Sequence, residues 1–231
     1  NVRDQDENGT AIPWANAQFR PTCSLSLGAP CMVFGQGLAT DLSYDGEVLY
    51  HEMSHAVVAA AANLPWVKGG AYGAIAAAPS INDGIADAFA VAQSLASKVG
   101  KYTSAEQVKF EKADGGTGSV YIAPTGFLRN LGRMQTCKGD GRIGPGGARV
   151  NPGLDGEVHN DGEIWGNFFW ELHQGLKGVN ANAVQSGSAP TCSGPECNAA
   201  AVAAFRALQS FYNTTITYEA YGNAVVQWLK T

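Results

Sequence analysis

The sequence predicts a mainly α (α+β) protein with a small N-terminal region of loops and short strands. Residues 1–45 are rich in Pro, Gly, Asp and Asn and hold short apolar stretches such as CMVFG, which is typical of loops and brief strands. Five later segments are long enough to be helices and have apolar residues at helical spacing, at about 46–63, 81–97, 161–177, 198–212 and 217–230. A chain of 231 residues is long enough to bury a core of its own. We therefore expect a single domain over 1–231, with a loop and strand lobe at 1–45 and a helical lobe at 46–231.

The composition argues against a nucleic-acid partner and against a membrane partner. The chain has 15% charged and 45% hydrophobic residues and a net charge of -5, and no cluster of Lys or Arg offers phosphate contacts. Its longest apolar run, HAVVAAAANLPWV, is interrupted by Asn63 and Pro65. That run falls short of the roughly 20 residues that a membrane-spanning helix needs.

The five cysteines form two close pairs, Cys23 with Cys31 and Cys192 with Cys197, and leave Cys137 on its own. The flanking stretches PTCSLSLGAPC and PTCSGPEC are polar and turn-rich, which suits disulfides in short loops better than core cysteines. Because disulfides persist in oxidising compartments, the pattern favours a secreted protein. Reduced core cysteines in a cytosolic enzyme are the alternative.

The stretch GEVLYHEMSHAVVAAAANLP, residues 46–65, holds two histidines four residues apart with a glutamate directly after the first. In an α-helix, residues i and i+4 share one face, so His51 and His55 can present imidazole nitrogens to one metal ion at about 2.0–2.1 Å. Glu52 then points to the side, where it can reach a water at the metal as a general base. The alternative is a surface pair of histidines that flanks a solvated glutamate.

Catalytic zinc usually takes three protein ligands, so a third ligand must come from elsewhere in the chain. A metzincin would place Gly and His three and six residues after His55, where this chain has Val and Ala, and that class is therefore excluded. The best source is PSINDGIADAFAVAQ, in which Asp83 and Asp87 lie one helical turn apart. We predict that Asp83 binds the metal and that Asp87 accepts the remaining N–H of a ligand histidine. Alternatively, Ser80 and Asp83 form a capping box at the start of a helix.

One more candidate lies in GEVHNDGEIWGNFFWELHQGL, residues 156–176, where His159 comes just before a predicted helix with a dense apolar face. A histidine at a helix entrance can donate a hydrogen bond to the oxyanion of a tetrahedral intermediate. The neighbouring acidic residues are equally typical of a solvated segment, so a loop histidine without a catalytic role is the alternative.

Taken in order, HEMSH, NDGIADAFA and HNDGEIWGNFFWEL resemble the three sequence blocks of fungalysin-type zinc metallopeptidases, and more distantly those of the thermolysin group within the gluzincins. The resemblance implies a zincin-like catalytic domain whose first block supplies two zinc ligands and the general base. The second family block reads G-E-G-W-S-D and supplies a glutamate ligand and a supporting aspartate. Here Asp83 stands at the place of the glutamate and Asp87 at that of the aspartate. The third block opens with a histidine that stabilises the transition state and matches His159.

The chain departs from this family in two respects. Aspartate in place of glutamate shortens the third ligand by one methylene, so the helix that carries Asp83 must approach the metal more closely or bind it more weakly. The region before His51 is also shorter than the β-rich lobe that these peptidases carry, so substrate preference does not follow from the resemblance. Tyr72 is the nearest equivalent of a tyrosine that assists the oxyanion in the thermolysin group.

The N-terminal stretch DQDENGT offers Asp4, Asp6 and Asn8 at alternate positions, as the first half of a calcium loop does. The glutamate that completes an EF-hand loop is missing, so a calcium site here needs further ligands, and a plain acidic turn is the alternative. Asn8 and Asn213 also fit the acceptor pattern for N-glycosylation.

These observations together predict a secreted, zinc-dependent endopeptidase that acts on protein or peptide substrates. The chain starts at Asn1 without Met or a signal peptide, so we expect a mature product from which a pro-segment has been removed. Two alternatives belong to other classes. One is a catalytically weak relative that uses the fold as a binding module, and the other is a zinc hydrolase of a non-protein amide or ester.

Overall fold

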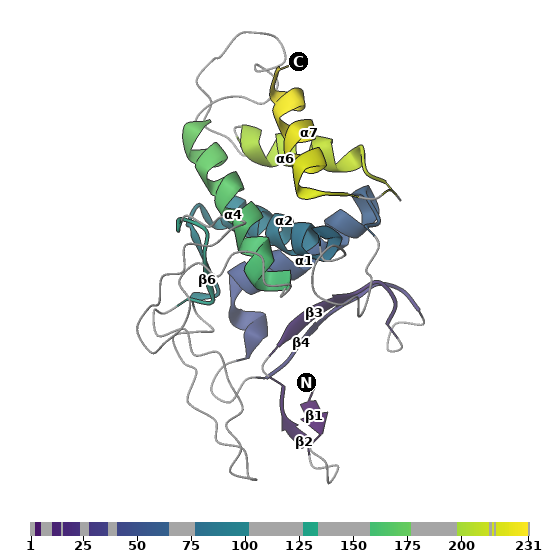
Figure 1. The fold of residues 1–231 in the computed structure, drawn as a ribbon. Helices are drawn as coiled ribbons and strands as arrows, with labels where there is room; N and C mark the ends of the chain where they lie inside the picture. Colours follow the sequence, from purple (N-terminus) through teal and green to yellow (C-terminus); the bar gives the residue numbers. More distant parts are fainter. Residues whose placement is uncertain are drawn as a thin grey trace.

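The structure, a computed structural model, confirms a mainly α fold in which short β-hairpins accompany long helices. It describes residues 3–5, 11–14, 16–23, 28–36, 41–64, 77–101, 127–133, 158–176, 198–212, 214 and 216–230. Figure 1 shows α1, α2 and α4 crossing in the middle of the molecule, α6 and α7 at the end near the C-terminus, and the N-terminal hairpins at the opposite end.

The long helices match the predicted segments, with shifted boundaries. They are α1 (Gly46–Ala61), α2 (Ala77–Ser94), α4 (Val158–Gly175), α6 (Ala199–Gln209) and α7 (Tyr218–Lys230). A 3-10 turn, η2 (Leu42–Tyr44), precedes α1. The start of α4 at Val158 means that His159 belongs to the first turn of that helix and does not precede it.

Helix α1 is closed at both ends by local hydrogen bonds. At its start the buried Asp45 side chain accepts hydrogen bonds from the N–H groups of Glu47 and Val48, which have no partner within the helix. At its end Asn63 takes a left-handed conformation with a φ of 45° and donates to the carbonyl of Ala59. These two caps set the length of the helix that carries the HEMSH stretch.

Helix α2 begins earlier than its apolar spacing predicts, at Ala77, so Ser80 and Asp83 both lie inside it. The capping-box alternative for this pair is therefore wrong. Pro79 lies in the first turn of α2, where a proline is tolerated because its missing N–H would have no helical partner.

The strands form short antiparallel pairs. Their bounds are β1 (Arg3–Gln5), β2 (Ala11–Pro13), β3 (Ala17–Arg20), β4 (Cys31–Phe34), β5 (Lys98–Val99) and β6 (Arg129–Asn130). In sequence order they pair β1 with β2, β3 with β4, and β5 with β6. The first four strands lie in the predicted N-terminal region, and β3 also packs against α1.

The predicted disulfide between Cys23 and Cys31 is present. It links the turn after β3 to the first residue of β4, and the register opposes Cys31 to Arg20. The bond thus joins the two strands at the loop end of the β3–β4 hairpin. Cys192, Cys197 and Cys137 lie outside the described residues, so their pairing stays a prediction.

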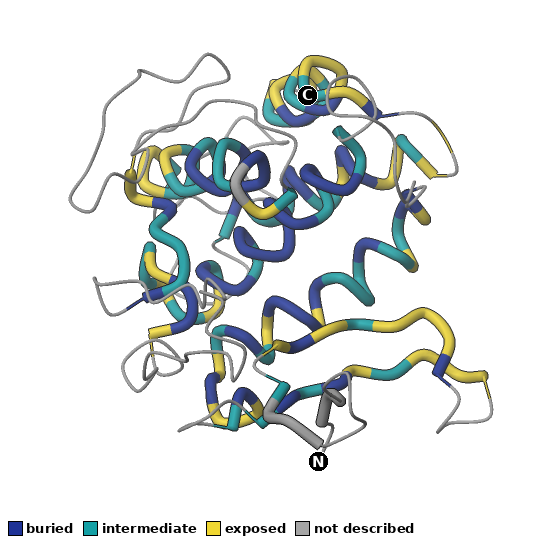
Figure 2. The backbone as a smooth tube through the Cα atoms, turned by 60° about the horizontal axis from the view of Figure 1, so that its bottom comes forward, coloured by how far each residue is buried: buried dark blue, intermediate teal, exposed yellow. Residues whose placement is uncertain are grey.

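The main core surrounds α2, which packs against α1 on one side and α4 on the other. Ile81 and Ile85 of α2 are fully buried, and each contributes about 1.5–3 kcal/mol through removal of its side chain from water. Trp165 of α4 and Tyr221 of α7 meet them, and the Tyr221 hydroxyl donates to the carbonyl of Ala204 in α6. Figure 2 shows the buried positions along the inner helices and exposed positions along α7 and the β3–β4 hairpin.

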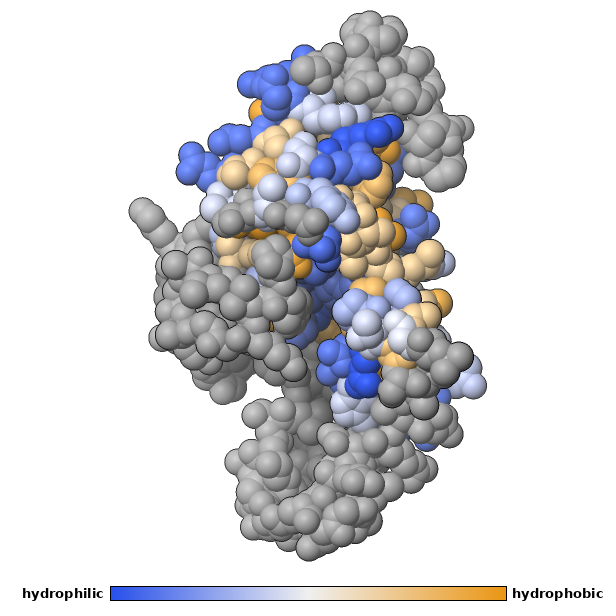
Figure 3. Space-filling model, turned by 90° about the vertical axis from the view of Figure 1, so that its right-hand side faces the viewer, coloured by the Kyte–Doolittle hydropathy of each residue, from blue (hydrophilic) through white to orange (hydrophobic). Residues whose placement is uncertain are grey.

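The outer surface mixes polar and apolar side chains on the face seen in Figure 3. Among the described residues, every helix is too short or too polar to cross a membrane.

Replacing both Cys23 and Cys31 by Ser should destabilise the β3–β4 hairpin, because an open loop has more conformational freedom in the unfolded chain. The chain-entropy model puts the loss for so short a loop at about 2–3 kcal/mol. Urea unfolding of the oxidised wild type and of the double variant, both without a reducing agent, measures it. The double variant should unfold at a lower urea concentration, and equal stability of the two proteins would contradict a stabilising role of the bond.

Candidate metal centre

Three side chains from α1 and α2 meet with their ligand atoms close together, which confirms that His51, His55 and Asp83 form a group able to hold a metal ion. His51 Nε2 lies 3.0 Å from His55 Nε2 and 3.4 Å from Asp83 Oδ1, and His55 Nε2 lies 3.8 Å from the same oxygen. Ligands bound tetrahedrally at about 2.0–2.1 Å stand about 3.3–3.4 Å apart. The three atoms are therefore spaced for a single ion.

The surroundings of Asp83 also fit a cation. Its carboxylate is buried, and Oδ2 has no hydrogen-bond partner among the described residues, while Oδ1 faces the histidines. A buried carboxylate oxygen without a donor is costly unless a positive charge compensates it. Two imidazoles and one carboxylate are the protein donor set of a catalytic zinc site, in which a water is the fourth ligand.

The first ligand, His51, is held in place by a buried ionic network. Its Nδ1 atom lies 2.7 Å from Asp87 Oδ1, which accepts the hydrogen bond and turns Nε2 towards the centre. Arg129 donates two hydrogen bonds to the same carboxylate, from Nε to Oδ2 at 2.5 Å and from Nη2 to Oδ1 at 2.7 Å. This fork geometry is the strong arrangement for an arginine and a carboxylate.

The second ligand, His55, is oriented by a neutral partner. Its Nδ1 atom lies 2.8 Å from Asn82 Oδ1, which accepts from the ring and leaves Nε2 facing His51. Asn82 directly precedes Asp83 on α2, so one helix turn supplies both a ligand and a support for another ligand.

Sequence reasoning missed Arg129 and Asn82. Arg129 reaches the centre because its strand, β6, pairs with β5, which follows α2. Two contacts of Leu131 hold this segment in place: its side chain packs on Val91 of α2, and its backbone carbonyl accepts a hydrogen bond from Asn167 of α4. A single arginine within the apolar run FLRNL was the available signal, since a charge there needs a buried partner.

The two histidines titrate differently in the metal-free site. Burial by itself would lower the pKa of His51, but the charges of Asp87 and Asp83 and their hydrogen bonds outweigh it and raise the pKa to about 9. Burial and the charge on His51 lower the pKa of His55 to about 4. Near neutral pH, His51 is therefore protonated and His55 is neutral.

The carboxylates of α2 stay ionised. Burial alone would raise the pKa of Asp83 and Asp87, but the charges of Arg129 and His51 outweigh burial and hold both values below the usual range. Asp83 is thus ionised and able to offer a carboxylate oxygen to a divalent cation.

Glu52 lies next to the cluster and is buried. Its Oε2 atom accepts a hydrogen bond of 2.6 Å from the N–H of Phe19 on β3. Burial raises the pKa of Glu52, although the charge on His51 and the Phe19 N–H act in the opposite direction. A carboxylate with a raised pKa, oriented by a backbone N–H, is suited to take up and release a proton.

His159 stands on the open side of the centre. Its Nε2 atom lies 3.8 Å from Asp83 Oδ1, and its side chain is 54% exposed whereas that of Asp83 is 4% exposed. The first turn of α4 therefore presents an imidazole at the boundary between the buried ligands and solvent.

Three further predictions concern parts of the chain that the structure does not describe. Tyr72, Asp6 and Asn8 lie outside the described residues, as does Asn213. Asp4 lies in β1, opposite Ile12 in the register. The oxyanion tyrosine, the calcium site and the glycosylation sites stay predictions.

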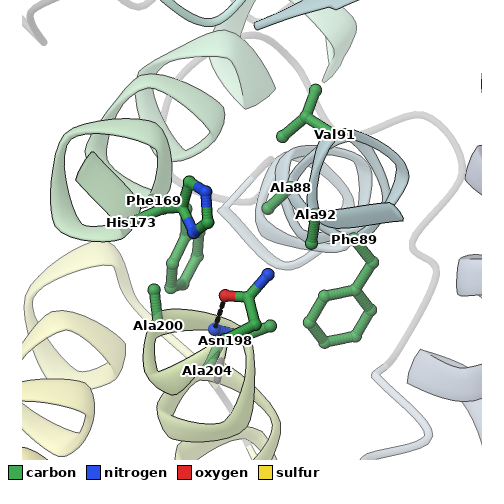
Figure 4. Close-up of a pocket in the computed structure, with 10 residues that line it drawn as sticks. Ala88, Phe89, Val91, Ala92, Phe169, His173, Asn198, Ala200 and Ala204 are labelled. Atoms are coloured by element: carbon green, nitrogen blue, oxygen red, sulfur yellow. Dashed lines mark hydrogen bonds between the residues drawn. The ribbon is translucent and has the colours of Figure 1, made fainter. Parts of the chain in front are cut away.

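A small cavity elsewhere in the helical body does not compete with this centre as a ligand site. It lies between α2, α4 and α6, and Figure 4 shows Phe169, His173 and Asn198 around it. Its volume of about 10 Å³ is close to what one water molecule needs. None of the three ligand residues lines it.

No protein-family model and no curated protein matches this sequence. The metal centre therefore rests on its own geometry.

Metal binding at pH 7 should release about one proton, because His51 is protonated in the metal-free protein and must lose that proton to offer Nε2 to the ion. Titration calorimetry with zinc in two buffers of different ionisation enthalpy counts the protons. In parallel, the metal-free protein should lose stability as the pH rises from about 6.5 through about 9, since His51 then loses its charge next to Asp87. Zero release at pH 7 would contradict the protonated state.

Replacing Arg129 by Met should lower the free energy of unfolding by about 3–5 kcal/mol, because it removes the arginine partner of the buried Asp87 carboxylate and leaves His51 as its positive partner among the described residues. Urea unfolding of the metal-free protein measures the loss. The double variant Asp87→Asn with Arg129→Met should recover most of it, since Asn can still accept from His51 and carries no charge. Arg129→Met as stable as the wild type would mean that the pair does not support the centre.

Proposed function

We propose that this protein is a secreted zinc-dependent endopeptidase of the fungalysin type. The observation that supports the proposal best is the convergence of His51 Nε2, His55 Nε2 and Asp83 Oδ1 at ligand spacing, with the buried carboxylate of Glu52 beside them. In the sequence these residues fall in the blocks that resemble those of fungalysins. The geometry adds what sequence similarity cannot supply, namely that the two blocks meet.

When bound, zinc supplies a Lewis acid that polarises a carbonyl and lowers the pKa of a water. His51, His55 and Asp83 would hold the ion. Glu52 accepts the proton of the attacking water and passes it to the leaving amine, a role that its raised pKa favours. His159, exposed beside Asp83, is placed to donate a hydrogen bond to the developing oxyanion. Asp87 keeps the His51 ring oriented through both steps.

The Cys23–Cys31 disulfide supports secretion, because such bonds survive in oxidising compartments. It also stabilises the hairpin whose β3 strand donates the Phe19 N–H to Glu52. The β3–β4 hairpin thus carries both the disulfide that supports secretion and the N–H group that orients the proposed base.

A binding module without peptidase activity is the second candidate, and one contact favours it. The Phe19 N–H already occupies Glu52 Oε2, and a base engaged in this way is less available to a water. A peptidase would have to use the other oxygen of Glu52, Oε1, because a base needs only one free lone pair towards the water.

Casein hydrolysis by the purified protein separates these functions. The wild type, stripped by chelator and then supplied with zinc, should cleave casein. Glu52→Gln should lose at least about a hundredfold in rate, the lower end of what a positioned base contributes. The same variant should still bind one zinc per chain, since Glu52 is not a ligand.

Glu171→Gln is the matched control, because this glutamate is exposed on α4. It should cleave casein at the wild-type rate. Zinc binding without cleavage in every sample, extended to small amides and esters, would favour the binding module. Cleavage of small substrates alone would favour a hydrolase of non-protein bonds.

A further inference from the structure

We propose that the crossing of α2 and α4 at Gly84 and Gly162 sets the length of the third metal ligand, so that this centre requires aspartate and rejects the longer glutamate. The inference rests on the proposed zinc function and concerns which carboxylate the site accepts.

The two helices touch backbone to backbone next to Asp83. A Cβ atom added to Gly84 would overlap the Gly162 carbonyl oxygen and lie 2.6 Å from Trp165 Cβ. Any side chain at Gly84 would therefore push the helices apart. Since Asp83 precedes Gly84 on α2, its position depends directly on this contact.

Gly162 bounds the space around the Asp83 carboxylate on one side. A Cβ atom added to Gly162 would lie 3.1 Å from Asp83 Oδ2, from Gly84 N and from the Ser80 carbonyl. The backbone of α4 thus forms a wall against Oδ2, and the burial of that oxygen follows from it.

The histidines bound the carboxylate on the other side. Asp83 Oδ1 already lies 3.4 Å from His51 Nε2 and 3.8 Å from His55 Nε2, close to the separation that tetrahedral ligands need. Glutamate would extend the side chain by about 1.5 Å, the length of one carbon–carbon bond. With Asp83 only 3% exposed, that extra methylene can be accommodated only by displacing the histidines or the α4 backbone.

This interpretation reverses the expectation from family resemblance. If glutamate were simply the better ligand, Asp83→Glu would strengthen or preserve zinc binding. If the glycine crossing sets the length of the ligand, the same change weakens zinc binding, because the longer side chain does not fit between the α4 backbone and the histidines.

Competition with a chromophoric chelator, which measures zinc affinity without any activity, tests the proposal. Asp83→Glu should bind zinc at least about tenfold more weakly than the wild type, comparable to the loss of a supporting contact. Gly162→Ala should also weaken binding severalfold, although Asp83 itself is unchanged. The visible spectrum of bound cobalt should shift in both variants, because the ligand geometry changes.

Gly175→Ala is the matched control, since a Cβ atom there meets nothing within 4 Å on the same helix. It should bind zinc like the wild type. Circular dichroism checks that each variant folds, and if Asp83→Glu does not, Gly162→Ala carries the test. Zinc binding by Asp83→Glu as tight as in the wild type, or unchanged binding by a folded Gly162→Ala, would overturn the proposal. A wild type that binds no zinc would instead refute the zinc site itself.

Discussion

The buried carboxylate of Asp87 is the interaction on which the centre depends. It accepts from His51 on α1 and from Arg129 on β6, and so links three elements that are far apart in the sequence. A buried ion pair of this kind adds little net stability compared with an apolar core, because desolvation cancels much of the attraction. Its contribution is geometric, since it holds one imidazole with Nε2 pointing at the other ligands.

The hydrophobic core lies on the other face of α2, the helix that carries Asp87. The face of α2 opposite the carboxylates carries Ile81 and Ile85, which belong to the same apolar cluster as Trp165 of α4 and Tyr221 of α7. One helix therefore serves two purposes, with its acids towards α1 and its apolar residues towards the core. The close approach at Gly84 joins these functions, because the same contact that completes the core places Asp83 beside the histidines.

Glu52 shows how the small N-terminal region takes part in a mainly helical site. The β3–β4 hairpin contributes one backbone N–H to the carboxylate, and a disulfide fixes the far end of the hairpin. Burial and this hydrogen bond move the Glu52 pKa in opposite directions, with burial the stronger. The pKa of Glu52 thus depends on its burial, on the charge of His51 and on the hydrogen bond from β3.

The sequence by itself determined the features that depend on residues close together in the chain. The spacing of His51 and His55 places both rings on one helix face, and the eight-residue separation of Cys23 and Cys31 allows a local disulfide. Helix existence also followed from apolar spacing, whereas the start of α2 at Ala77 did not. Only the tertiary structure decided the role of Arg129 and the Phe19 N–H, and the distance from Asp83 to the histidines. Arg129 and Asp87 are 42 positions apart in the sequence, and Phe19 and Glu52 are 33 apart. Residues so far apart meet only when helices and strands pack together, and the local sequence pattern does not specify that packing.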